Sequence, residues 1–126
     1  MSAWRLVYYR DSSGRYPVKE YVAKLDPGER AKVRFDFDLL KQFGVQLGAP
    51  YVRSLGGKLW ELRTTGRSQH RIVYFAVAGR RLVLLHAFVK KTQKTPQAQI
   101  DTAMRRMGEY LETERRAEAR QEHDRR

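Results

Sequence analysis

The chain contains no cysteine among its 126 residues. This absence excludes disulfide bonds, thiolate zinc sites and a cysteine nucleophile. Histidine is scarce too, and His70, His86 and His123 do not follow the spacing of metal ligands. The sequence also lacks a phosphate-binding glycine loop and a serine nucleophile motif. We therefore expect neither a metal nor another cofactor.

Long apolar runs are missing as well. No run approaches the roughly 20 apolar residues that a membrane helix needs. Residues 1–10 lack the basic head and the long apolar centre of a signal peptide. These absences predict a cytoplasmic protein that does not associate with a membrane.

Acidic residues are almost absent from the middle of the chain. Residues 53–94 hold ten Lys and Arg against one acid, Glu61, whereas residues 1–52 hold nine against six and residues 95–126 hold seven of each. Most of the net charge of +12 is therefore one block. Such a block attracts polyanions and suits nucleic acid as a partner, although a merely solvated basic surface explains the charge alone equally well.

Hydrophobic patterning predicts seven elements in the order β-α-α-β-β-β-α. Residues 27–43 alternate partly as a strand would, but Asp26 as a cap and Gly44 as a stop favour a helix. Thr95 and Pro96 are expected to cap and begin the last helix. The strands are expected at 3–9, 58–64, 71–77 and 81–88, the first helix at 17–25, and a loop at 44–57.

This order predicts an α+β protein, in which helices pack on a small antiparallel sheet. We expect one domain over residues 1–111. Residues 112–126 carry balanced charge and little apolar surface, which predicts a helical extension or a frayed tail. A sheet face that the helices leave uncovered would present basic side chains as a docking surface.

Two arginines are expected to meet on this sheet. Arg63 and Arg71 flank the turn at 64–70, so a hairpin would place their guanidiniums side by side, where they suit a bound phosphate. His86 and Lys90 share one side of the last strand, and Lys91 lies just past its end. Each residue alone is more often a solvated strand end, and a histidine in a sheet is more often a satisfied structural residue.

Such a cluster can cleave RNA without a metal and without a covalent nucleophile. The 2′-hydroxyl attacks the adjacent phosphate when a base removes its proton, and cations stabilise the charge that develops. A lysine among like charges has a lowered pKa and can act as that base or as the acid. Glu61 is expected to be ionised, as part of an internal ion pair.

Three segments resemble the RelE/HigB toxin superfamily, and within it the phage-derived HigB-like branch. They are KLWELR at 58–63, HRIVYF at 70–75 and LLHAFVKKTQKTP at 84–96, and the resemblance covers roughly residues 3–111. It implies a RelE-like fold and the toxin half of a type II toxin–antitoxin pair. Such toxins are typically ribosome-dependent endoribonucleases that cleave mRNA. The implied partner is a helix-turn-helix antitoxin, which forms a hetero-oligomer with the toxin and neutralises it.

The resemblance also implies roles for single residues. Arg71 matches an arginine that contacts the scissile phosphate, and Arg63 lies at a recurrent basic position. Lys90 and Lys91 fall where relatives place an acid or a phosphate ligand. Some relatives carry lysines where this chain has Leu59 and Glu61, so both Glu61 and Lys90 remain candidates for the base.

Further contacts to RNA are expected from basic and aromatic residues around this cluster. They are Lys58, Arg67, Tyr74, His86 and Lys94.

Two other functions are compatible with the same scaffold. One is a ParE-like toxin that poisons gyrase, which shares the fold but lacks the cationic cluster. The other is a non-catalytic nucleic-acid-binding or adaptor protein, which needs the charge but not its placement. The clustering of Arg71 with Lys90 and Lys91 is the feature that separates the nuclease from both.

Overall fold

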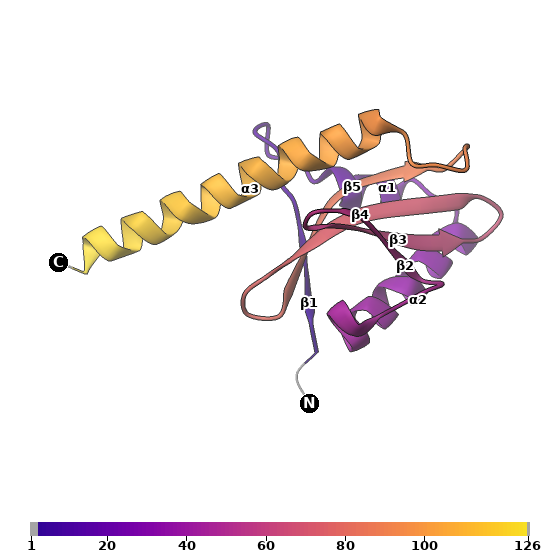
Figure 1. Ribbon diagram of the computed structural model, residues 1–126, viewed down its shortest axis with the longest axis horizontal. Helices are drawn as coiled ribbons and strands as arrows, with labels where there is room; N and C mark the ends of the chain where they lie inside the picture. The colour runs from indigo at the N-terminus through magenta and orange to yellow at the C-terminus, as the bar shows by residue number, and fades with distance from the viewer. Residues whose placement is uncertain (1–2, 126) are drawn as a thin grey trace.

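The computed structural model describes residues 3–125. The first residue of the expected domain and the last residue of the expected tail, 1 and 126, lie outside the described part. It contains three α-helices and five strands (Figure 1), and the predicted α+β class is confirmed. The elements are β1 (Arg5–Tyr8), α1 (Pro17–Ala23), α2 (Pro27–Phe43), a 3-10 turn (Gly44–Gln46), β2 (Val52–Gly56), β3 (Leu59–Thr65), β4 (Gln69–Val77), β5 (Arg81–Val89) and α3 (Gln97–Asp124).

The strands form one sheet in the order β1-β5-β4-β3-β2. Strands β2 to β5 are joined by short turns and pair antiparallel, and the pairing of β3, β4 and β5 is the predicted meander. Strand β1 pairs parallel with β5, because the chain crosses over through α1 and α2 before the meander begins. The sheet is therefore mixed, with one parallel edge pair.

Helices cover the two faces of the sheet unequally. Helices α1 and α2 pack on one face and bury a core that includes Val18, Leu40, Leu62 and Ile72. Helix α3 lies on the opposite face (Figure 1), where it packs against residues such as Phe75. Residues 115–124 of α3 are exposed and extend past the sheet. On the sheet face that α3 covers, the end of the sheet near the β3–β4 turn therefore remains accessible.

Helix α2 begins and ends where its flanking residues predict. The carboxylate of Asp26 accepts a hydrogen bond from the backbone N–H of Glu29, and Pro27 occupies the first turn. Gly44 ends the helix with a φ of +55°, and a Cβ built there would lie 2.2 Å from the indole of Trp4. Only glycine fits this helix end, because it combines a positive φ with close contact.

Two sequence predictions are wrong. The predicted loop at 44–57 contains β2, which pairs with β3 along the edge of the sheet. Thr95 does not cap the last helix, which begins at Gln97 without a side-chain cap. Its hydroxyl instead donates a hydrogen bond to Glu61.

Within residues 3–125, no helix combines the length and the apolar character that membrane spanning requires.

Candidate active site

A cationic pocket of about 610 Å³ lies where the β3–β4 turn meets the end of β5. None of the described residues that line it is acidic. Its cationic side chains come from two segments that are far apart in the chain, the β3–β4 hairpin and the end of β5. They are Arg63, Arg67, Arg71, Lys90 and Lys91.

Strand pairing brings these side chains together. Arg63 and Arg71 are direct partners in the β3–β4 register, which confirms the prediction made from the hairpin. On the other side of β4, Arg71 pairs with Phe88. The backbone N–H of Lys90 then donates to the carbonyl of Gln69 at 2.8 Å, so the lysine pair begins beside the arginine pair.

Arg71 is held from several sides at the base of the pocket. Its side chain is only 2% exposed, and its two terminal nitrogens donate to the carbonyl of His70 at 3.0 Å and to the Gln69 side chain at 3.1 Å. Burial lowers the pKa of Arg71, and the nearby Glu61 carboxylate opposes that shift. The guanidinium is therefore a fixed positive charge in a poorly solvated position.

Glu61 lies behind Arg71 and is fully buried. One carboxylate oxygen accepts a hydrogen bond from the Thr95 hydroxyl at 2.6 Å, and the other lies 3.9 Å from Nε of Arg71. The expected internal ion pair is thus present. Glu61 also links β3 to the loop that follows Lys90 and Lys91. It does not line the pocket, whereas Lys90 does.

Lys90 has the electrostatic environment that a catalytic lysine needs. Partial burial lowers the pKa of Lys90, and the charges of Arg71, Arg63 and Arg53 lower it further, against the opposing effect of Glu61. A lowered pKa increases the neutral fraction of an amine, which can then accept a proton. Lys91 is exposed and lines the same pocket.

The residues expected to contact RNA are dispersed. Arg67 lines the pocket and forms an ion pair with Asp26. Lys58 lies in the turn between β2 and β3, at the opposite end of β3 from the pocket, and Lys94 lies in the exposed loop before α3. Neither lysine belongs to the pocket lining.

Tyr74 and His86 are engaged by the protein itself. Tyr74 is buried in the core on the α1–α2 face, where burial raises its pKa, so the structure does not place it to contact RNA. His86 interacts with the side chain of Gln99 and with Arg106, both on α3, and stacks on Phe88. Burial lowers the pKa of His86. It is the satisfied sheet residue that its position suggested.

A buried polar chain supports the β3–β4 turn, and sequence patterning did not reveal it. The hydroxyl of Tyr21 lies 2.6 Å from Nδ1 of His70, and Nε2 of that ring lies 3.0 Å from the Glu29 carboxylate. The same carboxylate accepts the backbone N–H of Ser68 at 2.8 Å. Gln69, which holds Arg71, was also missed. Polar residues of helices and turns show no periodicity that marks such contacts in advance.

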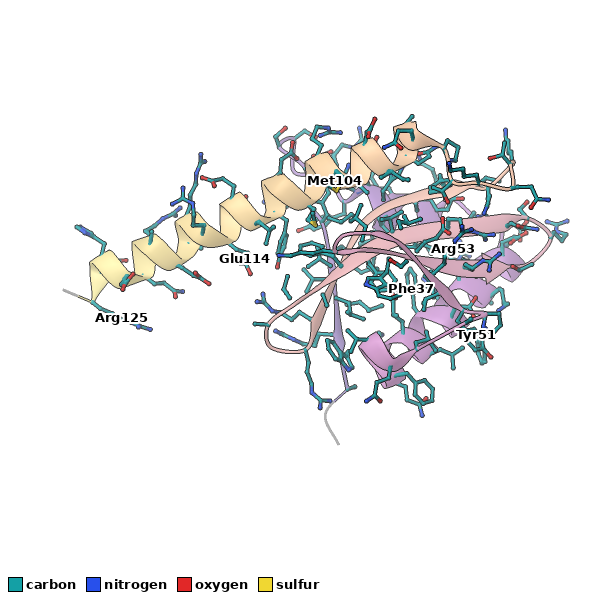
Figure 2. The ribbon with its side chains drawn as sticks, in the orientation of Figure 1. Phe37, Tyr51, Arg53, Met104, Glu114 and Arg125 are labelled. Carbon is teal, nitrogen blue, oxygen red and sulfur yellow. The ribbon has the colours of Figure 1, made fainter. Side chains whose placement is uncertain are left out.

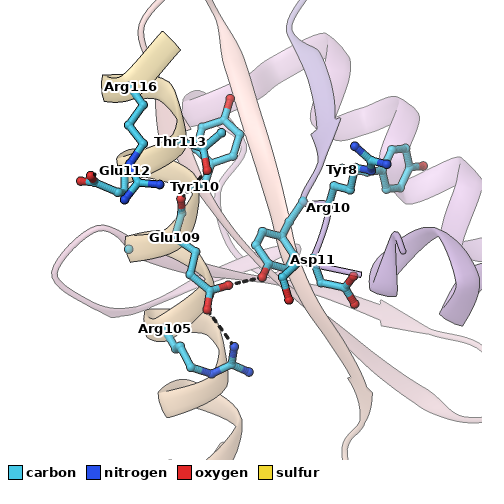
Figure 3. Close-up of a pocket in the computed structure, with 12 residues that line it drawn as sticks. Tyr8, Arg10, Asp11, Arg105, Glu109, Tyr110, Glu112, Thr113 and Arg116 are labelled. Carbon is cyan, nitrogen blue, oxygen red and sulfur yellow. Dashed lines mark hydrogen bonds and ion pairs between the residues drawn. The ribbon is translucent and has the colours of Figure 1, made fainter. Parts of the chain in front are cut away.

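A second hollow, of about 830 Å³, separates α3 from the segment after β1 (Figure 3). Its charges are mixed and already paired. The Glu109 carboxylate accepts hydrogen bonds from the Tyr9 hydroxyl and from Arg105, and Arg116 binds Glu112. The pocket at Arg71 is therefore the better anion site.

Across residues 3–125, no three His, Asp or Glu side chains group in a way that would hold a metal ion.

Comparison with known proteins shows the family to which the chain is related. The family model for phage derived protein Gp49-like (DUF891) matches residues 20–108. Two strains of Mycobacterium tuberculosis, CDC 1551 / Oshkosh and H37Rv, have a protein named probable endoribonuclease HigB1. It is 33% identical to this chain over 108 residues, which is 84% of this chain and 82% of the relative. The matched region of the family model includes every cation of the pocket.

Proposed function

The chain belongs to the phage-derived, HigB-like branch of the RelE/HigB toxin superfamily, and we propose that it is a toxin that cleaves mRNA on the ribosome. The observation that carries this proposal is the convergence of Arg63, Arg71, Lys90 and Lys91 on one pocket. A diffuse basic surface would not fix a buried arginine beside a lysine of lowered pKa. The placement of the charges therefore supports catalysis rather than binding alone.

The reaction we propose breaks the RNA backbone with its own 2′-hydroxyl. Lys90 in its neutral form takes the proton from that hydroxyl, whose oxygen then bonds to the adjacent phosphorus. The bond from phosphorus to the 5′-oxygen breaks, and Lys91 gives that oxygen a proton. The products are a 2′,3′-cyclic phosphate and a 5′-hydroxyl. This route needs neither a metal nor a covalent intermediate.

The arginines act on the charge that builds up at phosphorus. Arg71 and Arg63 lie side by side, so their guanidiniums contact the non-bridging oxygens of the pentacovalent phosphorane. Arg71 is already fixed by Gln69 and His70, so little reorganisation is needed when the charge develops. Glu61 orients Arg71 in this scheme and does not act as the base.

The same proposal assigns the partners. As a type II toxin, the protein acts in the cytoplasm, where the ribosome presents mRNA to the pocket. A helix-turn-helix antitoxin binds the toxin as a hetero-oligomer and suppresses its activity.

Substitution of Lys91 tests the catalytic assignment. Lys91 is exposed, so Lys91→Ala leaves the fold intact but removes a charge from the pocket. We expect cleavage to fall roughly 100- to 1,000-fold, as for loss of one stabilising donor, and growth arrest to disappear. Lys94→Ala is the matched control, since it removes an exposed lysine from the same loop outside the pocket.

Mapping the 5′ ends of cellular RNA after induction provides the readout. Cuts that follow the reading frame identify the ribosome as the site of action. Growth arrest by Lys91→Ala equal to that of the unchanged protein would contradict the assignment. DNA breaks without cuts in frame would instead indicate gyrase as the target.

A further inference from the structure

Two side chains at the start of β2 lie beside the cationic pocket, Tyr51 just before the strand and Arg53 within it. Arg53 pairs with Glu61 in the β2–β3 register, and the backbone N–H of Arg63 donates to the carbonyl of Tyr51 at 2.8 Å. Residues opposite one another on neighbouring strands share a face. Tyr51 and Arg53 therefore lie on the face that carries Arg63, and Figure 2 shows both at the end of the sheet remote from the C-terminus of α3.

A hollow of about 340 Å³ adjoins the pocket on this side. Arg63, Gln69 and Arg71 line both, so the two hollows are continuous across the arginine pair. The opposite wall of the second hollow includes Tyr51 and Lys32. A ligand held at Arg71 would therefore extend directly towards the ring of Tyr51.

The chemistry changes from one hollow to the next. Both carboxylate oxygens of Asp36 lie 2.9 Å from the ammonium of Lys32, so the positive charge that Lys32 adds is already compensated. Tyr51 is 41% exposed, which leaves part of its ring open to solvent. The first hollow thus suits a phosphate, and the part of the second hollow at Tyr51, away from the shared arginines, suits an uncharged, planar group.

We propose that Tyr51 is a stacking platform for an unpaired RNA base next to the phosphate at Arg71. The identity of this ligand as RNA rests on the proposed function. From Arg71 on β4 to Tyr51 at the β2 edge the path crosses two strand spacings, about 10 Å at ~4.8 Å each. This length exceeds the ~3.4 Å between stacked nucleotides of one strand, so the stacked base belongs to a neighbouring nucleotide.

Binding of two related oligonucleotides tests the platform. One is a 2′-O-methyl RNA hexamer of mixed sequence, which lacks the attacking hydroxyl, and the other is the same hexamer with abasic sugars. Fluorescence anisotropy measures the dissociation constant of each. Tyr51→Ala should weaken binding of the complete hexamer about 5- to 100-fold, because one stacked base is lost. Binding of the abasic hexamer should not change.

Three variants make the result specific. Tyr51→Trp should retain tight binding, because indole also stacks. Tyr16→Ala is the matched control, since Tyr16 is 39% exposed, precedes α1 as its N-cap and lines neither hollow. The link from Tyr51 to Arg63 is made by backbone atoms, so substitution of the side chain preserves it. Arg71→Gln should weaken binding of both hexamers, because both contain phosphates.

The two proposals fail in different ways. If Tyr51→Ala binds both hexamers as tightly as the unchanged protein, there is no platform, whatever Arg71→Gln does. If Tyr51→Ala weakens only the complete hexamer but Arg71→Gln and Lys91→Ala change neither, the platform stands and the phosphate pocket fails. Loss of abasic binding in Tyr51→Ala would also overturn the platform, since it would show a contact to the backbone instead.

Discussion

The contact between Glu61 and Arg71 is an ion pair almost without solvent. The side chains are 0% and 2% exposed, and their nearest charged atoms are 3.9 Å apart. Nε of Arg71 and one oxygen of Glu61 have no hydrogen-bond partner among the described residues. A pair of this kind gains little net stability, since desolvation offsets the attraction. We infer that it is retained because it holds Arg71 in position.

Removal of one partner should therefore be costly. Glu61→Gln leaves the buried charge of Arg71 without a counterion, which should lower the free energy of unfolding by about 3–5 kcal/mol. Urea denaturation measures this change. The double variant Glu61→Leu/Arg71→Met should recover most of the loss, because it removes both charges and keeps the apolar volume.

An exposed pair provides the comparison. Arg15 and Glu20 are 3.0 Å apart and largely solvated, so Glu20→Gln should change the free energy of unfolding far less than Glu61→Gln does. An equally small loss in Glu61→Gln would show that Arg71 does not depend on its buried partner.

The sequence predicted which residues form the pocket better than it predicted which helices cover the neighbouring residues. Alternation and the short turn placed Arg63 opposite Arg71, because an antiparallel hairpin leaves few other registers. Alternation also put Tyr74 on the face opposite Arg71, but did not show that α1 and α2 cover that face. His86 shares the face of Arg71 and is nevertheless removed from the pocket by α3. Contacts between distant segments decide such cases, and local patterns do not contain them.

At the scale of elements, helices α2 and α3 use glycine differently. Gly44 ends α2 with a positive φ, and a Cβ added there would overlap the indole of Trp4. Gly108 lies within α3, and a Cβ added there would meet no atom within 4 Å. An alanine should therefore have opposite effects at the two positions.

Thermal and urea unfolding of two single variants measures this difference. Gly44→Ala should lower the free energy of unfolding by at least about 1–2 kcal/mol, the cost of a left-handed conformation for an L-residue. The overlap with Trp4 adds to that cost. Gly108→Ala should raise it by about 0.5–1 kcal/mol, because alanine is the better helix former. A gain in stability for Gly44→Ala would show that this helix end is not constrained as described.

Elements with strong local signals were predicted well. Helix α2 has its cap, its first proline and its glycine stop within its own sequence, and each is used as expected. Strand β2 was missed because Gly56, Gly57 and Pro50 dominate its surroundings, and its pairing with β3 is a property of the edge that it occupies. The start of α3 was misplaced by one residue, because the hydroxyl of Thr95 binds a buried carboxylate rather than the helix.

For the whole molecule, the distribution of paired and unpaired charge matters more than the net value. Along α3, Arg115 and Arg116 both bind Glu112, and Arg105 binds Glu109. The cations of the pocket face each other with no acid among the described lining residues. We therefore expect RNA to be attracted to one end of the molecule and not to the long helix.

The salt dependence of RNA binding measures this polarity. Each phosphate that a cation neutralises contributes about −0.7 to the slope of log K against log salt for a single strand. Lys91→Ala should reduce the magnitude of that slope by about 0.7, whereas Arg116→Ala, a matched loss of one charge on α3, should leave it unchanged. Equal slopes for both variants would show that binding follows total charge instead of the pocket.

The parallel pairing of β1 with β5 has a consequence for how the toxin is made. Synthesis begins at the N-terminus, so β1 leaves the ribosome long before the strand that completes its edge of the sheet. The lysine pair and Thr95 follow later still, and only then does Glu61 gain its hydrogen bond. A nascent or truncated chain therefore lacks the complete catalytic centre that we propose, so the proposed activity on the ribosome would arise only when translation of this message is nearly complete.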